Sequence, residues 1–167
     1  MDIVDRRKRT PRKGDGGVYL VVVDQTPEFD IALHYAARCA ESRRGHVALL
    51  QIFDVDDFQD WGTVESRILN ELRAEAEQQA QRAAQKIFDL TGKVSAIYIS
   101  EGKTNSKVID IVNEDDSLVC LVLGGGVTSG GPGPLISHFA GKALGKLRVP
   151  IIVVPGNLDS GRIDAIT

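Results

Sequence analysis

Cysteine, aromatic residues and long hydrophobic runs are all scarce in this sequence. Cys39 and Cys120 are too few for a disulfide framework, and each falls in a stretch typical of a buried helix or strand. We expect both to be buried free thiols, which pack as small hydrophobic groups. No apolar run approaches the roughly 20 residues that span a bilayer. The N-terminal residues are polar and basic rather than an apolar signal core, so we expect a cytoplasmic protein.

Recognisable catalytic and metal-binding patterns are also missing. His34, His46 and His138 are scattered along the chain, and there is no Cys-x-x-Cys pair, Walker sequence or nucleophile elbow. The acidic segment 54–60 lacks the ligand spacing and glycine of an EF-hand, so we interpret it as a solvated loop. The sequence therefore predicts a protein that is not an enzyme. Weak nucleotide hydrolysis is a competing hypothesis for which no base, nucleophile or metal set is visible.

The composition is that of one ordinary globular domain. The chain has 167 residues, of which 43% are hydrophobic and 26% charged, with a net charge of −3. Residues 1–15 differ from the rest because they carry six Lys or Arg against three Asp. We interpret them as a disordered, solvated arm; contact with nucleic acid, anionic lipid or an acidic partner is the alternative. The arm has no aromatic residue to stack on bases, which gives a nucleic-acid role little support.

Hydrophobic runs alternate with helical patterns along the rest of the chain. Five runs are apolar enough to be buried strands, at 17–24, 46–54, 93–100, 117–124 and 149–156. Helical spacing predicts helices within 25–45 and at 64–92, 105–115 and 137–148. Thr26 and Pro27 suit the cap and the first position of the first helix. The segment from Gly156 onward predicts a loose tail over 157–167.

This alternation predicts a single α/β domain over residues 16–156. Buried strands joined by helices form an open, five-stranded parallel sheet with right-handed crossovers and helices on both faces. In such sheets the ligand cleft lies beyond the carboxyl ends of the strands, where the chain order reverses. With the order 3-2-1-4-5, that point lies between strand 1, which ends in Asp24, and strand 4, which ends in Gly124.

Several segments resemble the universal stress protein (UspA-like) family. The blocks "VYLVVVDQTPEFDIALHYAARCA", "VALLQIFDV", "LVLGGG" and "RVPIIVVPG" are similar to its strands 1, 2, 4 and 5, with the Asp and helix that follow strand 1. The resemblance covers about residues 17–156. It implies a UspA-like, adenine-nucleotide α-hydrolase-like fold, and a homodimer formed by pairing of strand 5 from Pro150 to Pro155.

The resemblance also supplies candidate nucleotide-binding residues. In members that bind ATP, G-x2-G-x9-G-[ST] follows strand 4; here Gly124 matches, while Val127, Ser137 and His138 stand at the other three positions. Neighbouring Gly126 does not restore the pattern. Val127 is β-branched and resists the positive φ that glycine allows. We also expect its side chain to occupy ribose or phosphate space.

The family pattern places two further residues near a nucleotide. By resemblance, Asp24 lies near the ribose and phosphates, and Ile52 meets adenine through its backbone. A strand-end cap and plain core are the alternatives for these two residues. A helix N-terminus near Ser137 and the loop glycines 130–133 offer a different anion site.

Two hypotheses follow for the function. The first is a dimeric, non-catalytic stress or regulatory module with weak or absent ATP binding. The second is a switch in which the rearranged glycine loop accepts AMP, ATP or another anion.

Overall fold

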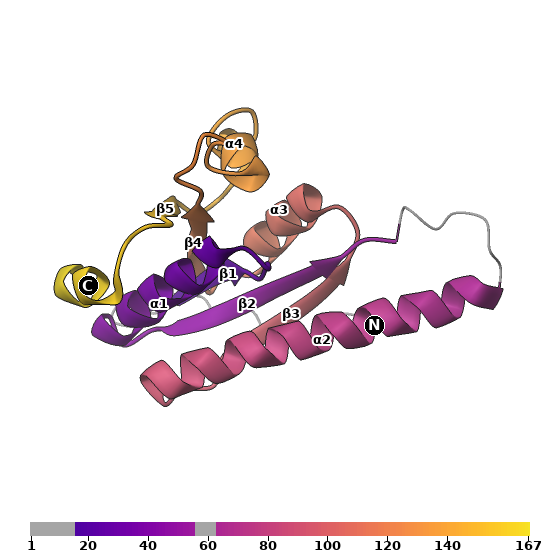
Figure 1. Cartoon of the computed structure of the whole chain (residues 1–167), viewed down its shortest axis with the longest axis horizontal. Helices are drawn as coiled ribbons and strands as arrows, with labels where there is room; N and C mark the ends of the chain where they lie inside the picture. Colours follow the sequence, from indigo (N-terminus) through magenta and orange to yellow (C-terminus); the bar gives the residue numbers. More distant parts are fainter. Residues whose placement is uncertain (1–15, 56–62) are drawn as a thin grey trace.

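Five parallel strands form an open, twisted sheet in the part of the chain that the structure describes (Figure 1). The computed structural model describes residues 16–55 and 63–167. The strands are β1 (Val18–Val22), β2 (His46–Phe53), β3 (Ala96–Glu101), β4 (Leu118–Gly125) and β5 (Ile151–Pro155). Their order is β3-β2-β1-β4-β5. The predicted topology is therefore confirmed, with strand boundaries that differ by at most three residues.

Helices cover both faces of this sheet. The helices are α1 (Pro27–Ser42), α2 (Thr63–Thr91), α3 (Thr104–Glu114), α4 (Pro134–Phe139) and α5 (Ser160–Ile166). Side chains of α1 and α2 pack in one hydrophobic cluster with one face of the sheet, and those of α3 and α4 pack with the other face. Figure 1 shows α2 as the longest helix, running along β2 and β3.

The central strand β1 is buried on both faces, as its continuous apolar run predicts. Leu20 and Val22 belong to the cluster on the α3 side, whereas Tyr19 and Val21 belong to the cluster on the α1 side. Strands apolar on both faces are typical of parallel sheets covered by helices. The core thereby holds the ends of β1 and β4 rigidly side by side.

The helix predicted at 137–148 is wrong in extent. Helix α4 begins at Pro134, because proline suits the first position of a helix, and it ends after Phe139. Turns and a short 3-10 segment, Leu144–Lys146, follow in place of further α-helix. Gly141 and Gly145 fall in this stretch, and glycine disfavours a helix interior.

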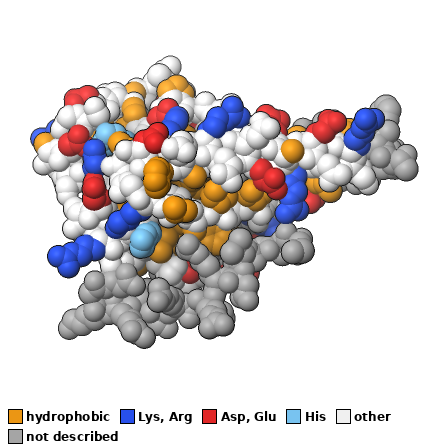
Figure 2. Space-filling view, turned by 90° about the horizontal axis from the view of Figure 1, so that it is seen from below, with side chains coloured by type: hydrophobic (Ala, Val, Ile, Leu, Met, Phe, Trp, Pro, Cys, Tyr) orange, Lys and Arg blue, Asp and Glu red, His pale blue; other side chains and the backbone are white. Residues whose placement is uncertain are grey.

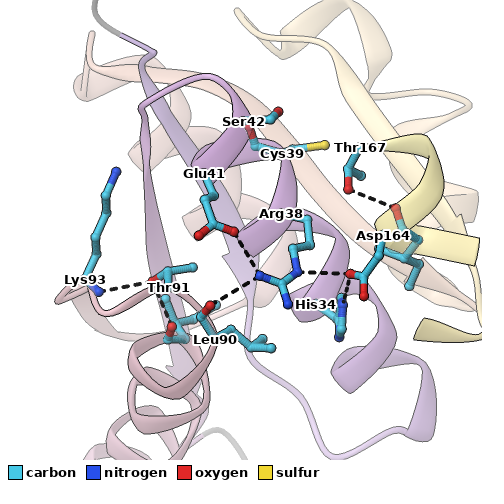
Figure 3. Close-up of polar contacts among 12 residues, drawn as sticks. His34, Arg38, Cys39, Glu41, Ser42, Leu90, Thr91, Lys93, Asp164 and Thr167 are labelled. Carbon is cyan, nitrogen blue, oxygen red and sulfur yellow. Dashed lines mark hydrogen bonds and ion pairs between the residues drawn. The ribbon is translucent and has the colours of Figure 1, made fainter. Parts of the chain in front are cut away.

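The predicted loose tail is also wrong, because residues 160–166 form α5. Asp159 caps this helix by accepting a hydrogen bond from the Arg162 backbone N–H at 2.9 Å, and Ile163 is fully buried. Figure 3 shows how α5 is attached to α1: Asp164 pairs with His34 Nε2 at 2.8 Å and with Arg38 Nε at 3.0 Å. The end of the chain is thus held against α1.

Arg38 joins three helices at this point. Besides Asp164 of α5, its guanidinium contacts Glu41 of the same helix at 2.9 Å and the Leu90 carbonyl of α2 at 3.3 Å (Figure 3). A planar guanidinium has five N–H donors in a fixed fork, so one side chain can satisfy several acceptors. The junction therefore fixes α5 and the end of α2 to α1.

Some predictions concern surfaces and segments away from the core. The basic arm 1–15 and Asp56, Asp57 and Asp60 of the acidic segment lie outside the described residues. None of the described helices combines the length and apolar character that crossing a membrane requires. On the face drawn in Figure 2, Lys and Arg alternate with Asp and Glu, and the described residues there form no basic patch.

Candidate functional site

A cleft of about 800 Å³ lies at the carboxyl ends of β1, β2 and β4. Its walls come from the starts of α1 and α3 and from the loop between β4 and α4. Apolar side chains form much of the lining: Val21, Val23, Phe29, Ala32, Ile52 and Leu123. The volume is in the range of small-molecule sites, and the position is the reversal point that the strand order predicted.

The side chain of Asp24 closes the turn between β1 and α1. Its Oδ1 accepts hydrogen bonds from the Thr26 backbone N–H at 2.8 Å and from the Thr26 hydroxyl at 2.6 Å. Thr26 stands at the N-cap of α1, but its side chain makes no capping bond to the helix, contrary to the sequence prediction. Asp24 lines the cleft, and one of its carboxylate oxygens is already engaged in local structure.

Gly124 lies against the first turn of α1. A Cβ at this position would come within 2.4 Å of the Glu28 carbonyl oxygen and 2.7 Å of its carbonyl carbon. A Cβ on Gly156 would likewise come within 2.3 Å of Glu28 Cγ. The glycine that matches the family signature therefore has a packing role, since it lets α1 cross directly over the end of β4.

The loop that follows β4 is bonded to itself. The Gly126 N–H donates to the Pro132 carbonyl at 3.2 Å, and the Gly131 N–H donates to the Thr128 carbonyl at 3.1 Å. A Cβ on Gly126 would meet the Gly131 carbonyl oxygen at 2.7 Å, which keeps the two sides of the loop in contact. A phosphate cradle needs backbone N–H groups aimed at the ligand. Two N–H groups of this loop are used within the loop.

The predicted residues divide into two groups. Asp24, Ile52, Gly124 and Gly126 line the cleft, whereas Val127, Ser137 and His138 are not among its lining residues. Val127 is 53% exposed and so does not fill the ribose or phosphate space that we expected it to occupy.

Helix α4 begins at Pro134 rather than near Ser137, and Pro134, Leu135 and Ile136 line the cleft. Ser137 lies inside α4, not at its start, and its N–H donates to the Gly133 carbonyl at 3.1 Å. His138 lies in the last turn of the same helix and packs edge-on against Phe139, with ring centroids 5.1 Å apart. Neither residue presents an unsatisfied backbone donor to the cleft.

The charged groups of the cleft are mostly acidic. Asp24, Glu28 and Asp54 line it, and Lys103 is the ammonium that the described lining contributes. Lys103 Nζ pairs with Asp54 Oδ2 at 3.0 Å. The charged side chains of the described lining therefore carry a net negative charge, which disfavours the phosphates of a nucleotide.

Several cleft residues were missed by the sequence analysis. Glu28, Lys103, Thr104 and Asn105 reach the cleft from the starts of α1 and α3, and Gln51 reaches it from β2. Gln51 is the one polar residue inside the run "VALLQIF", and this interruption is the signal that could have identified it.

The described residues offer neither a metal-binding group nor a reactive thiol. They contain no group of three His, Cys, Asp or Glu side chains that could hold a metal ion. Cys120 is buried and Cys39 half-buried, and both are free. Burial raises the pKa of the Cys120 thiol to about 11, so it is a poor nucleophile at neutral pH.

The fold is that of a parallel α/β protein with a cleft at the strand reversal. The sequence model of the universal stress protein family matches residues 19–155, and the chain belongs to that family. A comparison with curated proteins gave no significant match.

Solved structures with the same fold include other universal stress proteins. UspA from Lactobacillus plantarum is 18% identical, with a TM-score of 0.66, over 84% of this chain and 98% of its own. The Archaeoglobus fulgidus protein in complex with dAMP is 17% identical, with a TM-score of 0.55, over 82% and 96%. A universal stress protein in complex with cAMP is 12% identical, with a TM-score of 0.56, over 83% and 96%.

Proposed function

We propose that this protein is a non-catalytic regulatory module of the universal stress protein family that binds ATP weakly or not at all. The observation that carries the proposal is the state of the β4–α4 loop. The Gly126 and Gly131 N–H groups bond to carbonyls of the loop itself, so these donors are not available to a phosphate. A triphosphate could use these two donors only if the loop opened.

Electrostatics support the same function. Glu28 lies over the end of β4, and its Oε1 would be 3.8 Å from a Cβ on Gly126. A phosphate held by the loop would therefore sit near this carboxylate, and Asp24 adds a second negative charge to the cleft. Like charges at such separations repel by an amount that reduces affinity several-fold or more.

The proposed module is a homodimer that pairs through β5. This strand is at the edge of the sheet, where one row of backbone N–H and C=O groups has no neighbouring strand within residues 16–55 and 63–167. Val153 in its middle is 44% exposed, although it is a large hydrophobic residue. Light scattering coupled to size-exclusion chromatography tests this. We expect a dimer for the native chain and a monomer for Val153→Asp; a monomeric native chain contradicts the pairing.

A nucleotide-binding switch is the second candidate. It is favoured by the cleft's position and by the complexes of dAMP and cAMP with proteins of the same fold. In this case the loop rearranges to release its N–H groups, and AMP or ATP is the ligand.

Isothermal titration calorimetry with ATP and Mg²⁺ separates the two functions. The proposed function predicts no saturable heat at micromolar ATP and no release of phosphate on long incubation. Saturable micromolar binding favours the switch, and protein-dependent phosphate release contradicts the non-catalytic role. The same titration with GTP controls for non-specific association of a polyanion.

A further inference from the structure

An unpaired amide oxygen is buried beside the cleft. Gln51 in β2 is only 6% exposed, and its Oε1 has no hydrogen-bond partner among the residues that the structure describes. Its Nε2 donates to the Ile52 carbonyl at 3.5 Å, which is at the limit for a hydrogen bond. Buried polar groups are nearly always paired with protein or with ordered water, so an unpaired acceptor next to a cavity marks a place where a water or a ligand donor can bind.

The surroundings of Gln51 favour a flat, largely apolar ligand. Side chains alternate across a strand, so Gln51 faces the same side as Val47 and Leu49, toward α1 and α2. On this side the cleft is lined by Phe29 and Ala32 of α1 and by Gln79 of α2. A heteroaromatic base has apolar faces and N–H donors at its edge, which suits apolar walls with a buried acceptor.

The mouth of the cleft favours hydroxyl groups over phosphate. Asp24 and Glu28 present carboxylate oxygens, which accept hydrogen bonds and do not donate them, and the carboxylate of Asp54 pairs with Lys103. Sugar hydroxyls can donate to such oxygens, whereas an ionised phosphate is itself an acceptor and carries negative charge. The loop that would hold a phosphate uses the Gly126 and Gly131 N–H groups internally.

We propose that the cleft binds a nucleoside that carries no phosphate, and that Gln51 Oε1 accepts a hydrogen bond from its base. The proposal rests on the proposed function, in which phosphate is not accommodated. It adds a ligand class and assigns to Gln51 the role of selecting bases that present an N–H donor.

The test is calorimetric titration of the full chain with adenosine, purine riboside and AMP. Purine riboside lacks the exocyclic amino group, which is the donor of the adenine base. We expect adenosine to bind at least about tenfold more tightly than either of the other two ligands. Purine riboside loses the hydrogen bond to Gln51, and the phosphate of AMP is repelled by the carboxylates of the cleft. Equal binding of adenosine and purine riboside, or tighter binding of AMP, overturns the proposal.

A matched pair of variants tests the residue itself. Gln51→Leu removes the acceptor at similar volume, and we expect about a tenfold loss of adenosine affinity with no fall in thermal stability. Gln78→Leu makes the same change on an exposed position of α2, outside the cleft lining, and should bind adenosine as the native chain does. Unchanged affinity in Gln51→Leu overturns the proposal. The ligand series on the native chain decides the question if this variant does not fold.

The outcomes also separate this inference from the proposed function. If neither adenosine nor ATP binds, the inference fails while the module with weak or absent ATP binding stands. If ATP binds at micromolar concentration, the proposed function fails, and the inference fails with it.

Discussion

Replacing Gly124 with alanine should destabilise the fold by a measurable amount. The added Cβ would lie 2.4 Å from the Glu28 carbonyl oxygen, where ordinary contacts begin near 3.4 Å, so α1 or the end of β4 must move by about 1 Å. Overpacking of this kind costs about 1–3 kcal/mol, partly offset by the smaller unfolded-state entropy of alanine. We expect a net loss of about 2 kcal/mol in the free energy of unfolding, which lowers Tm by about 4–8 °C in a chain of this size.

Gly145→Ala is the matched control for this experiment. A Cβ at Gly145 meets no atom within 4 Å, and its φ is not positive, so alanine there should leave stability unchanged or raise it by up to about 1 kcal/mol. Urea denaturation followed by circular dichroism measures both variants. Equal midpoints for the two variants would refute the packing role of Gly124. If Gly124→Ala loses stability as expected, weaker ligand binding by Gly124 variants can result from disturbed packing. It would then be no proof that Gly124 contacts a phosphate.

Three further predictions concern charges and thiols. Glu28→Gln keeps the side-chain volume but removes the carboxylate. If that carboxylate lies about 5 Å from the phosphate of bound AMP, with an effective dielectric constant of about 40, its removal should strengthen AMP binding about tenfold at low salt. Calorimetry measures this change in affinity. The hydrogen bond from His34, and to a smaller extent that from Arg38, lowers the pKa of Asp164. The ionised carboxylate therefore stabilises the fold at pH values above the ordinary carboxyl pKa. This stabilisation is lost as the pH falls through the lowered pKa. The Tm of Asp164→Asn should therefore be lower than the Tm of the native chain at neutral pH and equal to it at strongly acidic pH. A difference in Tm that does not change with pH would contradict this linkage. Iodoacetamide followed by mass spectrometry should label Cys120 only after denaturation, because burial raises the pKa of its thiol to about 11; rapid labelling of the native protein would argue against that burial.

Local sequence signals were sufficient to predict the sheet. Continuous apolar runs identified all the strands, and Pro27 at the start of a helix marked where α1 begins. Alternation of strands and helices then limited the topology to parallel arrangements with right-handed crossovers. The order β3-β2-β1-β4-β5 followed from these and from the family resemblance.

The end of the chain could not be predicted because its structure depends on distant residues. Helix α5 has only seven residues, too few to be stable alone. It is held by Ile163 in the core and by the contacts of Asp164 with His34 and Arg38, more than a hundred residues earlier. No pattern within 157–167 contains that information.

The site was predicted in position but not in its interactions. Asp24 and Gly124 were expected at the strand reversal, and both line the cleft there. The roles of the glycines depend on tertiary contacts: Gly124 faces the Glu28 backbone, and Gly126 faces Gly131. The family signature treats Gly124 as a phosphate-binding residue, whereas the contacts of Gly124 indicate packing and those of Gly126 indicate loop closure.

Titration of ¹⁵N-labelled protein with ATP and Mg²⁺, followed by amide NMR, tests the central claim most directly. The account predicts that the Gly126 and Gly131 amide signals stay in place at micromolar ATP, because both N–H groups are bonded within the loop. Saturable shifts of these two signals at micromolar ATP would show that the loop opens to hold phosphate, and would contradict the account.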